Sequence, residues 1–190
     1  PVILVNMTGS AMDLRFADAH FSAVVQGWYP GARGGKAIAE LLFGEYSPSG
    51  KLPVTFYNSA DDLPAFIDYA MENRTYRYFA GDVLYPFGFG LTYGKTAVTA
   101  ASAEKTEGGW RVTASLEHSG AAGGDVVEVY IRDNESKFAV RNYSLCGFKP
   151  VAFSGAEMKQ AEIFVPDAAL EIVDDRGERR VDLSLIHISE

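Results

Sequence analysis

Residues 28–56 read WYPGARGGKAIAELLFGEYSPSGKLPVTF, and this stretch predicts a loop, a helix, a turn and a strand, in that order. The helix is predicted from Ile38, Leu41 and Leu42, whose spacing puts three apolar side chains on one face. Gly44 follows the last of them and suits a left-handed residue just past the helix end, because glycine has no Cβ to clash there.

Turn residues flank this helix on both sides. Pro30 and Gly31 predict a turn before it, and the Ser-Pro-Ser-Gly run at residues 47–50 predicts a turn after it. Residues 52–56 are β-prone, although Pro53 should lie at the start of the strand or at a sheet edge because proline cannot donate to a ladder. The stretch therefore indicates an α/β layered domain.

Composition excludes several classes of partner. The chain has 190 residues, which suits one large domain or two small ones, and a net charge of −8, which disfavours nucleic acid or an anionic membrane as a partner. No apolar run approaches the roughly 20 residues of a membrane span. Cys146 is the single cysteine, so no internal disulfide can form.

The first thirty residues carry two apolar runs. Residues 2–5 and 21–25 predict strands buried on both faces, and residues 13–18 alternate loosely between them. Residues 6–10 form the loop after the first strand, a position that often builds sites in α/β sheets. Because Pro1 leads directly into an apolar strand, we expect the chain to be a piece of a longer protein.

The pattern changes to alternation from about residue 95. Apolar and polar residues alternate over residues 110–117 and again over 127–131, with a small-residue turn at 119–124. Short alternating strands separated by such turns predict an antiparallel sandwich.

Several segments, in this order and spacing, resemble the C-terminal α/β-sandwich domain of family 3 glycoside hydrolases, the β-glucosidases and β-xylosidases. The resembling segments are residues 1–5, 28–31, 34–39, 41–44, 48–56 and 85–93. Residues 124–130 and 145–149 resemble the fibronectin type III-like domain that ends many members of that family.

The resemblance implies an architecture. Residues 1–94 would be the C-terminal part of an α/β sandwich, and residues 95–182 an immunoglobulin-like, fibronectin III-like all-β sandwich that lacks its last strand. Residues 183–190, LSLIHISE, look like translated adapter or vector sequence, and we expect them to be a non-native tail.

The resemblance also implies an activity for the parent protein. Retaining glycosidases use two carboxyl groups about 5 Å apart, one as nucleophile and one as acid then base. In this family both precede the sequence that matches Pro1, so we assign no catalytic residue here and expect the chain alone to be inactive. Members of the family carry an N-terminal (β/α)8 barrel domain before the region that matches this chain. The parent would be an exo-acting β-glycosidase that binds a β-linked oligosaccharide or aryl glycoside through that barrel domain.

Arg74, Tyr76 and Arg77 are the candidate substrate-binding residues. Aromatic faces pack on sugars and arginine donates hydrogen bonds to hydroxyls, and a similar run in xylosidase-like members favours β-xylosidase over β-glucosidase. The competing interpretation is a half-buried strand with Tyr76 and Tyr78 on one face and Arg74 paired locally. Asp68 and Glu72 are weaker candidates for sugar contact.

Other chemistries have little support in the sequence. The three histidines, His20, His118 and His187, lack metal-ligand spacing, and we predict no metal and no cofactor. The run at residues 31–36 departs from a phosphate loop, and Asp61-Asp62 indicates a solvated loop. The alternative function is a non-catalytic carbohydrate-binding or scaffolding module; an α/β hydrolase would need a G-x-S-x-G elbow, which is absent.

Overall fold

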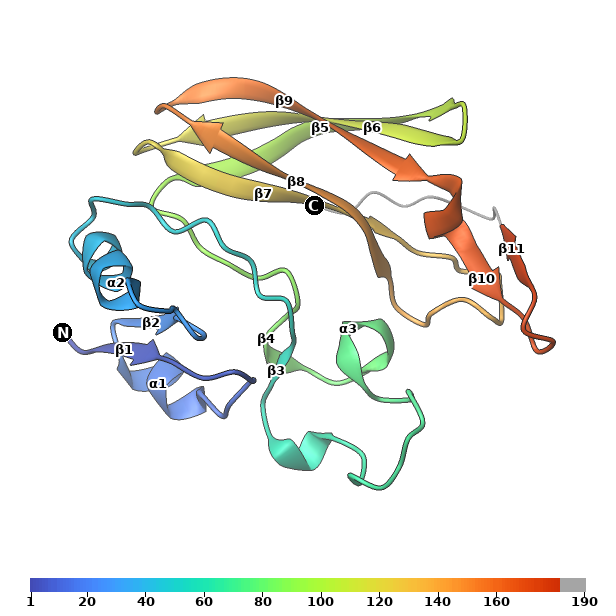
Figure 1. The fold of residues 1–190 in the computed structure, drawn as a ribbon, viewed down its shortest axis with the longest axis horizontal. Coiled ribbons are helices and arrows are strands. Elements are labelled where there is room, and N and C mark those ends of the chain that lie inside the picture. Colours follow the sequence, from blue (N-terminus) through green and yellow to red (C-terminus); the bar gives the residue numbers. More distant parts are fainter. Residues whose placement is uncertain (182–190) are drawn as a thin grey trace. The chain divides into compact units, whose positions relative to one another are not determined.

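The computed structural model describes residues 1–181, which form two units (Figure 1). Unit 1 comprises Pro1–Tyr46 and Lys51–Gly90, and unit 2 comprises Ser47–Gly50 and the chain from Leu91 onward. The described chain is mostly β-strand with a few short helices. The predicted tail at residues 183–190 lies outside the described residues.

Unit 1 alternates short strands and helices. Its elements are β1 (Ile3–Asn6), α1 (Arg15–His20), β2 (Ala23–Gln26), α2 (Gly34–Leu42), β3 (Phe56–Tyr57), the 3₁₀ helix η1 (Ala60–Asp62), α3 (Thr75–Tyr78) and β4 (Val83–Tyr85). Strands β1 and β2 are parallel, with Ile3 opposite Ala23, and β3 and β4 are antiparallel.

The prediction of two strands near the amino end is confirmed, but their predicted burial is wrong. Ile3 is 44% exposed, and Leu4 and Val5 are only half-buried. A strand is buried on both faces only where further layers cover both faces. In the described chain β1 and β2 pair only with each other, so much of their apolar surface stays accessible.

Residues 13–18 contain part of a helix rather than the loose alternation seen in the sequence. Helix α1 is short, and Asp13 supports its first turn because its Oδ1 accepts a hydrogen bond from the Arg15 amide at 3.1 Å. The Arg15 guanidinium also pairs with Asp13 Oδ2 at 2.6 Å. These local hydrogen bonds favour a helical turn over an extended strand. The apolar alternation spans only six residues, which is too short to specify a strand against them.

Helix α2 confirms the prediction for the central stretch. It begins at Gly34 and ends at Leu42, and Gly44 follows with φ of +76°. The Gly44 amide donates to the Leu41 carbonyl at 3.1 Å and the Glu45 amide to the Glu40 carbonyl at 2.8 Å. This pair of bonds is the Schellman motif, which satisfies carbonyls that the helix end would otherwise leave open.

The predicted strand over residues 52–56 is shorter than expected, since β3 contains only Phe56 and Tyr57. Leu52 nevertheless makes two backbone hydrogen bonds with residues 88–89. Its amide donates to the Phe89 carbonyl, and its carbonyl accepts from the Gly88 amide, both at 2.8 Å. Pro53 follows and has no amide to continue a ladder, so the pairing is interrupted.

Unit 2 consists of antiparallel sheets. Its elements are β5 (Lys95–Thr106), β6 (Gly109–Ser119), β7 (Gly123–Ile131), β8 (Ser144–Phe153), β9 (Glu157–Pro166), the 3₁₀ helix η2 (Asp167–Leu170), β10 (Glu171–Val173) and β11 (Arg179–Val181). One sheet has the order β5-β6-β9 and a second pairs β7 with β8, while β10 and β11 form a small hairpin (Figure 1).

The core of unit 2 lies between the two larger sheets. Val112, Ala114 and Leu116 of β6 are buried, whereas Arg111 and Glu117 are exposed, so the predicted alternation is confirmed. The three buried residues of β6 pack with buried residues from the neighbouring elements, namely Val129, Phe153, Ala161, Ile163, Val165 and Leu170.

His118 continues this inward series as a buried polar residue. Its Nδ1 lies 3.0 Å from Thr96 Oγ1 and its Nε2 lies 3.0 Å from the Ala121 carbonyl. The ring stacks on Phe153 with 4.3 Å between centroids. Gly94 passes so close that a Cβ there would lie 2.3 Å from the imidazole. With both ring nitrogens partnered, His118 is a structural residue.

The cap of α2 provides a direct test of this account. Gly44→Ala forces an L side chain into a left-handed conformation, which costs about 1 kcal/mol, so exchange of the Glu45 amide should accelerate about fivefold. Gly35→Ala is the matched control, because a Cβ at Gly35 meets nothing within 4 Å. Amide exchange followed by NMR checks both; equal rates in Gly44→Ala and the parent chain would refute the role of the cap.

Candidate functional site

Of the three candidate residues, Arg74 ends an irregular segment of unit 1, and Tyr76 and Arg77 follow it in α3. We call residues 64–75 the Arg74 loop; it connects η1 to α3. Two local bonds shape its first half, because the Asp68 amide donates to the Ala65 carbonyl and the Ala70 amide donates to Asp68 Oδ1, both at 2.9 Å. These bonds form consecutive turns.

The Arg74 guanidinium holds this loop together from within. Its Nε donates to the Ala70 carbonyl at 3.0 Å, and its Nη2 donates to the carbonyls of Ala65 at 3.1 Å and Asp68 at 2.5 Å. Arginine suits this task because its five N–H donors are fixed in one plane. The interpretation that Arg74 pairs locally is therefore confirmed, with carbonyl groups as partners.

Strained backbone marks the end of the loop. Asn73 and Thr75 have φ of +55° and +56°, a region that a β-branched residue such as Thr75 seldom enters. The Tyr57 hydroxyl accepts a hydrogen bond from the Thr75 amide at 2.8 Å and so supports this conformation. Strain of this kind persists only where surrounding contacts fix it.

The predicted strand over Tyr76 and Tyr78 is wrong, because Thr75–Tyr78 forms the helical turn α3. The Tyr76 ring stacks on Phe87 with centroids 4.1 Å apart, and the Arg77 guanidinium lies 5.9 Å from the Tyr76 ring. The structure thus brings Tyr76 and Arg77 together and turns Arg74 back into its own loop. Of the three, only Arg77 is an exposed residue; Arg74 and Tyr76 are half-buried.

The acidic residues around the loop are solvated. Asp61 and Asp62 are exposed, as predicted, but they lie in the 3₁₀ helix η1 rather than in a loop. Ser59 and Asp62 cap this helix: Asp62 Oδ2 accepts from the Ser59 amide at 2.8 Å, and Ser59 Oγ accepts from the Asp61 amide at 3.1 Å. Asp68 and Glu72 are exposed too. The loop therefore presents negative charge to solvent.

The loop after β1 is a second place where the sequence predicted a site. Asn6 is buried, and its Nδ2 donates to Gln26 Oε1 at 2.6 Å and to Thr8 Oγ1 at 3.2 Å. The Thr8 hydroxyl in turn donates to the Ser10 carbonyl at 2.9 Å. These polar groups satisfy one another, so they hold the strand ends rather than point at a ligand.

Nucleophile and phosphate chemistry find no support in the geometry. Cys146 Sγ donates to the Val129 carbonyl at 3.2 Å, and burial raises the pKa of its thiol to about 11, which disfavours the reactive thiolate. Lys36, which a phosphate loop would require, lies 3.3 Å from Glu40 on the same helix. Within residues 1–181 no three His, Cys, Asp or Glu side chains are grouped to hold a metal ion. No helix in this range is long and apolar enough to cross a membrane.

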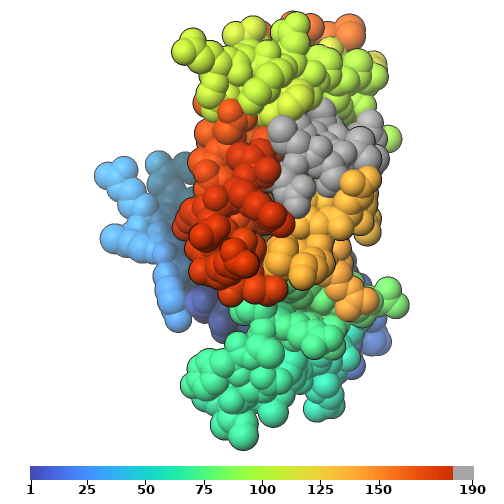
Figure 2. Space-filling view, turned by 90° about the vertical axis from the view of Figure 1, so that its right-hand side faces the viewer, coloured from blue at the N-terminus to red at the C-terminus, as the bar shows by residue number. Residues whose placement is uncertain are grey.

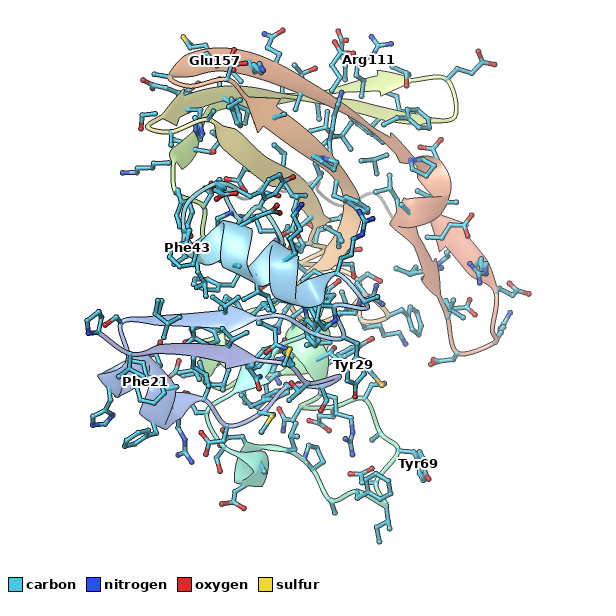
Figure 3. All side chains as sticks on the ribbon, turned by 60° about the vertical axis from the view of Figure 1, so that its left-hand side comes forward. Phe21, Tyr29, Phe43, Tyr69, Arg111 and Glu157 are labelled. Atoms are coloured by element: carbon cyan, nitrogen blue, oxygen red, sulfur yellow. The ribbon has the colours of Figure 1, made fainter. Side chains whose placement is uncertain are left out.

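Sequence reasoning missed the most exposed apolar residues of the Arg74 loop. Phe66, Ile67 and Tyr69 are 93%, 83% and 89% exposed. Figure 2 shows this part of the chain, in blue-green, as open surface, and Figure 3 shows Tyr69 pointing away from the ribbon. The available signal was the apolar pair Phe66-Ile67 between the acidic residues Asp61-Asp62 and Asp68.

Solved structures place this fold among the glycoside hydrolases. A β-glucosidase from Streptomyces venezuelae, solved in complex with D-glucose, superposes with a TM-score of 0.83 and 27% sequence identity. The match covers 94% of this chain and 25% of that one.

Curated sequences agree with this class. A xylan 1,4-β-xylosidase from Xylanibacter ruminicola is 39% identical over 91% of this chain and 20% of its own length. A periplasmic β-glucosidase from Salmonella typhimurium is 32% identical over 90% of this chain and 25% of its own length. Residues 1–93 match the glycosyl hydrolase family 3 C-terminal domain. The chain belongs to glycoside hydrolase family 3, and it spans about a fifth to a quarter of the length of these two relatives.

The structural role of Arg74 can be separated from that of its neighbour. Arg74→Ala removes three hydrogen bonds from the loop, and we expect chymotryptic cleavage after Phe66 and Tyr69 to accelerate about tenfold. Arg77→Ala is the matched control and should change the rate by less than about twofold, since Arg77 makes none of these bonds. If both variants are cleaved as slowly as the parent, Arg74 does not hold the loop.

Proposed function

We propose that this chain is the non-catalytic C-terminal portion of a retaining, exo-acting β-glycosidase of carbohydrate catabolism. The observation that carries this proposal is the 39% identity to a xylan 1,4-β-xylosidase across 91% of the chain, of which the chain spans one fifth. A length difference of this size leaves ample sequence in such a protein for the two carboxyl groups that glycoside hydrolysis requires.

The environments of the acidic residues support a non-catalytic role for the chain itself. A retaining enzyme needs two carboxyl groups about 5 Å apart, one of which is held protonated at neutral pH. A general acid needs a raised pKa, but two carboxyl groups of this chain have lowered ones. Hydrogen bonds from Arg15 lower the pKa of Asp13 to about 2, and hydrogen bonds from Ser154 and Lys159 lower the pKa of Glu157. Both groups remain ionised and neither suits a general acid.

We propose that residues 95–182 form a fibronectin III-like domain. Two antiparallel sheets that enclose a core of alternating inward residues support this assignment. Such a domain would contribute a stable β unit to the chain rather than a reactive group.

We propose that Tyr76 and Arg77 of α3 contact the sugar and that Arg74 fixes the loop that precedes this helix. The support is chemical: Arg77 presents an exposed guanidinium beside an aromatic ring, the pair of groups that sugar hydroxyls and C–H faces use. The higher identity to the xylosidase than to the glucosidase favours a β-xyloside as substrate.

Activity assays test the proposal directly. The isolated chain should release no nitrophenol from nitrophenyl β-xyloside or β-glucoside. A chimaera in which residues 1–181 replace the 176 matched residues of the Xylanibacter xylosidase should be active, whereas that xylosidase truncated before the matched region should not. Turnover by the isolated chain would contradict the proposal. A chimaera that folds but is inactive would favour the alternative, a separate carbohydrate-binding or scaffolding module.

The same chimaera tests the sugar contact. Arg77→Ala should raise KM about three- to tenfold through loss of one or two hydrogen bonds. Arg111→Ala, an exposed arginine on β6, is the control and should leave KM unchanged. Equal KM values in the two variants would remove Arg77 from the substrate site.

A further inference from the structure

Residues 47–50, the Ser-Pro-Ser-Gly turn between α2 and β3, follow unit 1 in the sequence but group with unit 2 in the fold. Residues 47–49 are half-buried, whereas Tyr46 and Gly50 on either side of them are exposed. Serine and proline are mostly exposed in proteins. Burial of all three residues therefore indicates contacts beyond the turn itself.

The Ser47 hydroxyl joins the turn to the segment that leads into β5. Its Oγ accepts a hydrogen bond from the Tyr93 amide at 3.1 Å and lies 2.9 Å from Thr92 Oγ1. These partners are 46 and 45 residues away along the chain, so neither contact is a local turn bond. Pro48 favours an extended backbone at Ser47, which limits the conformations that the serine loses when it makes these bonds.

Two glycines at the start of β7 make room for the same turn. A Cβ at Gly123 would lie 2.8 Å from Ser47 Oγ, and a Cβ at Gly124 would lie 3.4 Å from Ser49 Cβ. The first distance is too short for a real side chain, so close packing against the turn requires glycine at position 123.

We propose that residues 47–50 act as a latch, a segment from the middle of unit 1's sequence that unit 2 needs for its full stability. The latch consists of the Ser47 hydroxyl bonds and the contacts of the turn with Gly123 and Gly124. Two hydrogen bonds are significant in a domain whose net stability is small. Unit 2 is then no separable module, because a chain cut between residues 94 and 95 would lose part of its fold.

The competing interpretation is a plain connection between α2 and β3 that belongs to unit 1. Lys51, the residue after the turn, does bond within unit 1, since its Nζ donates to the Gly90 carbonyl at 3.0 Å. Ser47 instead bonds to residues 92–93, which belong to unit 2. A plain connection would need neither these bonds nor a glycine at position 123.

Urea unfolding of the whole chain tests the latch, with Trp110 fluorescence as the signal for unit 2 in a Trp28→Phe background. Ser47→Ala removes the hydroxyl, and the Trp110 midpoint should fall by about 0.5–1 M urea. Gly50→Ala is the matched control in the same turn and should leave the midpoint unchanged, because a Cβ there meets nothing within 4 Å. Ser59→Ala removes a cap of η1 in unit 1 and should leave the Trp110 midpoint unchanged too.

Two further readouts approach the latch from its partners. Gly123→Ala should displace the turn and lower the Trp110 midpoint at least as far as Ser47→Ala does. If Gly123→Ala does not fold, exchange of the Tyr93 amide replaces it. That exchange should accelerate about fivefold in Ser47→Ala and stay unchanged in Gly50→Ala.

Equal Trp110 midpoints in Ser47→Ala and Gly50→Ala would overturn the latch, as would an unchanged exchange rate of the Tyr93 amide in Ser47→Ala. A fall confined to the Trp28 signal, measured in a Trp110→Phe background, would assign the turn to unit 1 and overturn it as well. None of these readouts is an enzymatic activity, so failure of the latch leaves the proposed glycosidase function standing.

Discussion

Burial of apolar side chains holds unit 2 together and is largely missing from unit 1. Unit 2 buries nine apolar residues in the described chain, whereas unit 1 buries Leu14, Ala17 and Phe56. Full burial of a large apolar side chain contributes about 1.5–3 kcal/mol, and a domain retains only about 5–15 kcal/mol of net stability. A difference of six residues is therefore large enough to decide which unit is stable by its own contacts.

Local contacts take the place of a core in unit 1. Phe56 is enclosed by the rings of Trp28 and Tyr85, with centroids 6.4 and 6.1 Å away, and the Tyr85 hydroxyl donates to Asp18 Oδ1 at 2.6 Å. The helix cap at Gly44 and the hydrogen bonds from Arg74 to the carbonyls of its own loop add order without much burial. These contacts fix the conformation of individual loops in unit 1 although few of its side chains are buried.

The sequence predicted what short-range physics decides. Alternation along β6, the α2 helix and its left-handed Gly44 each depend on residues within one or two turns, and all three are confirmed. The burial of β1 was predicted wrongly because apolar β-branched runs report only a preference for burial and not what covers the strand. The competing interpretation of the Arg74 segment as a strand was wrong, because the partners of Arg74, carbonyls up to nine residues away, leave no periodic signal in the sequence. The exposed apolar residues Phe66, Ile67 and Tyr69 were missed for the same reason, since exposure is a property of the fold.

The two tryptophans allow one measurement of the central claim that unit 1 depends on contacts beyond those it makes itself. Trp28 reports on unit 1 and Trp110 on unit 2, so Trp110→Phe and Trp28→Phe variants of the isolated chain isolate each signal during urea unfolding. The account predicts a cooperative transition for Trp110, and for Trp28 a transition at much lower urea or a gradual drift. Coincident, equally steep transitions for the two residues would contradict it.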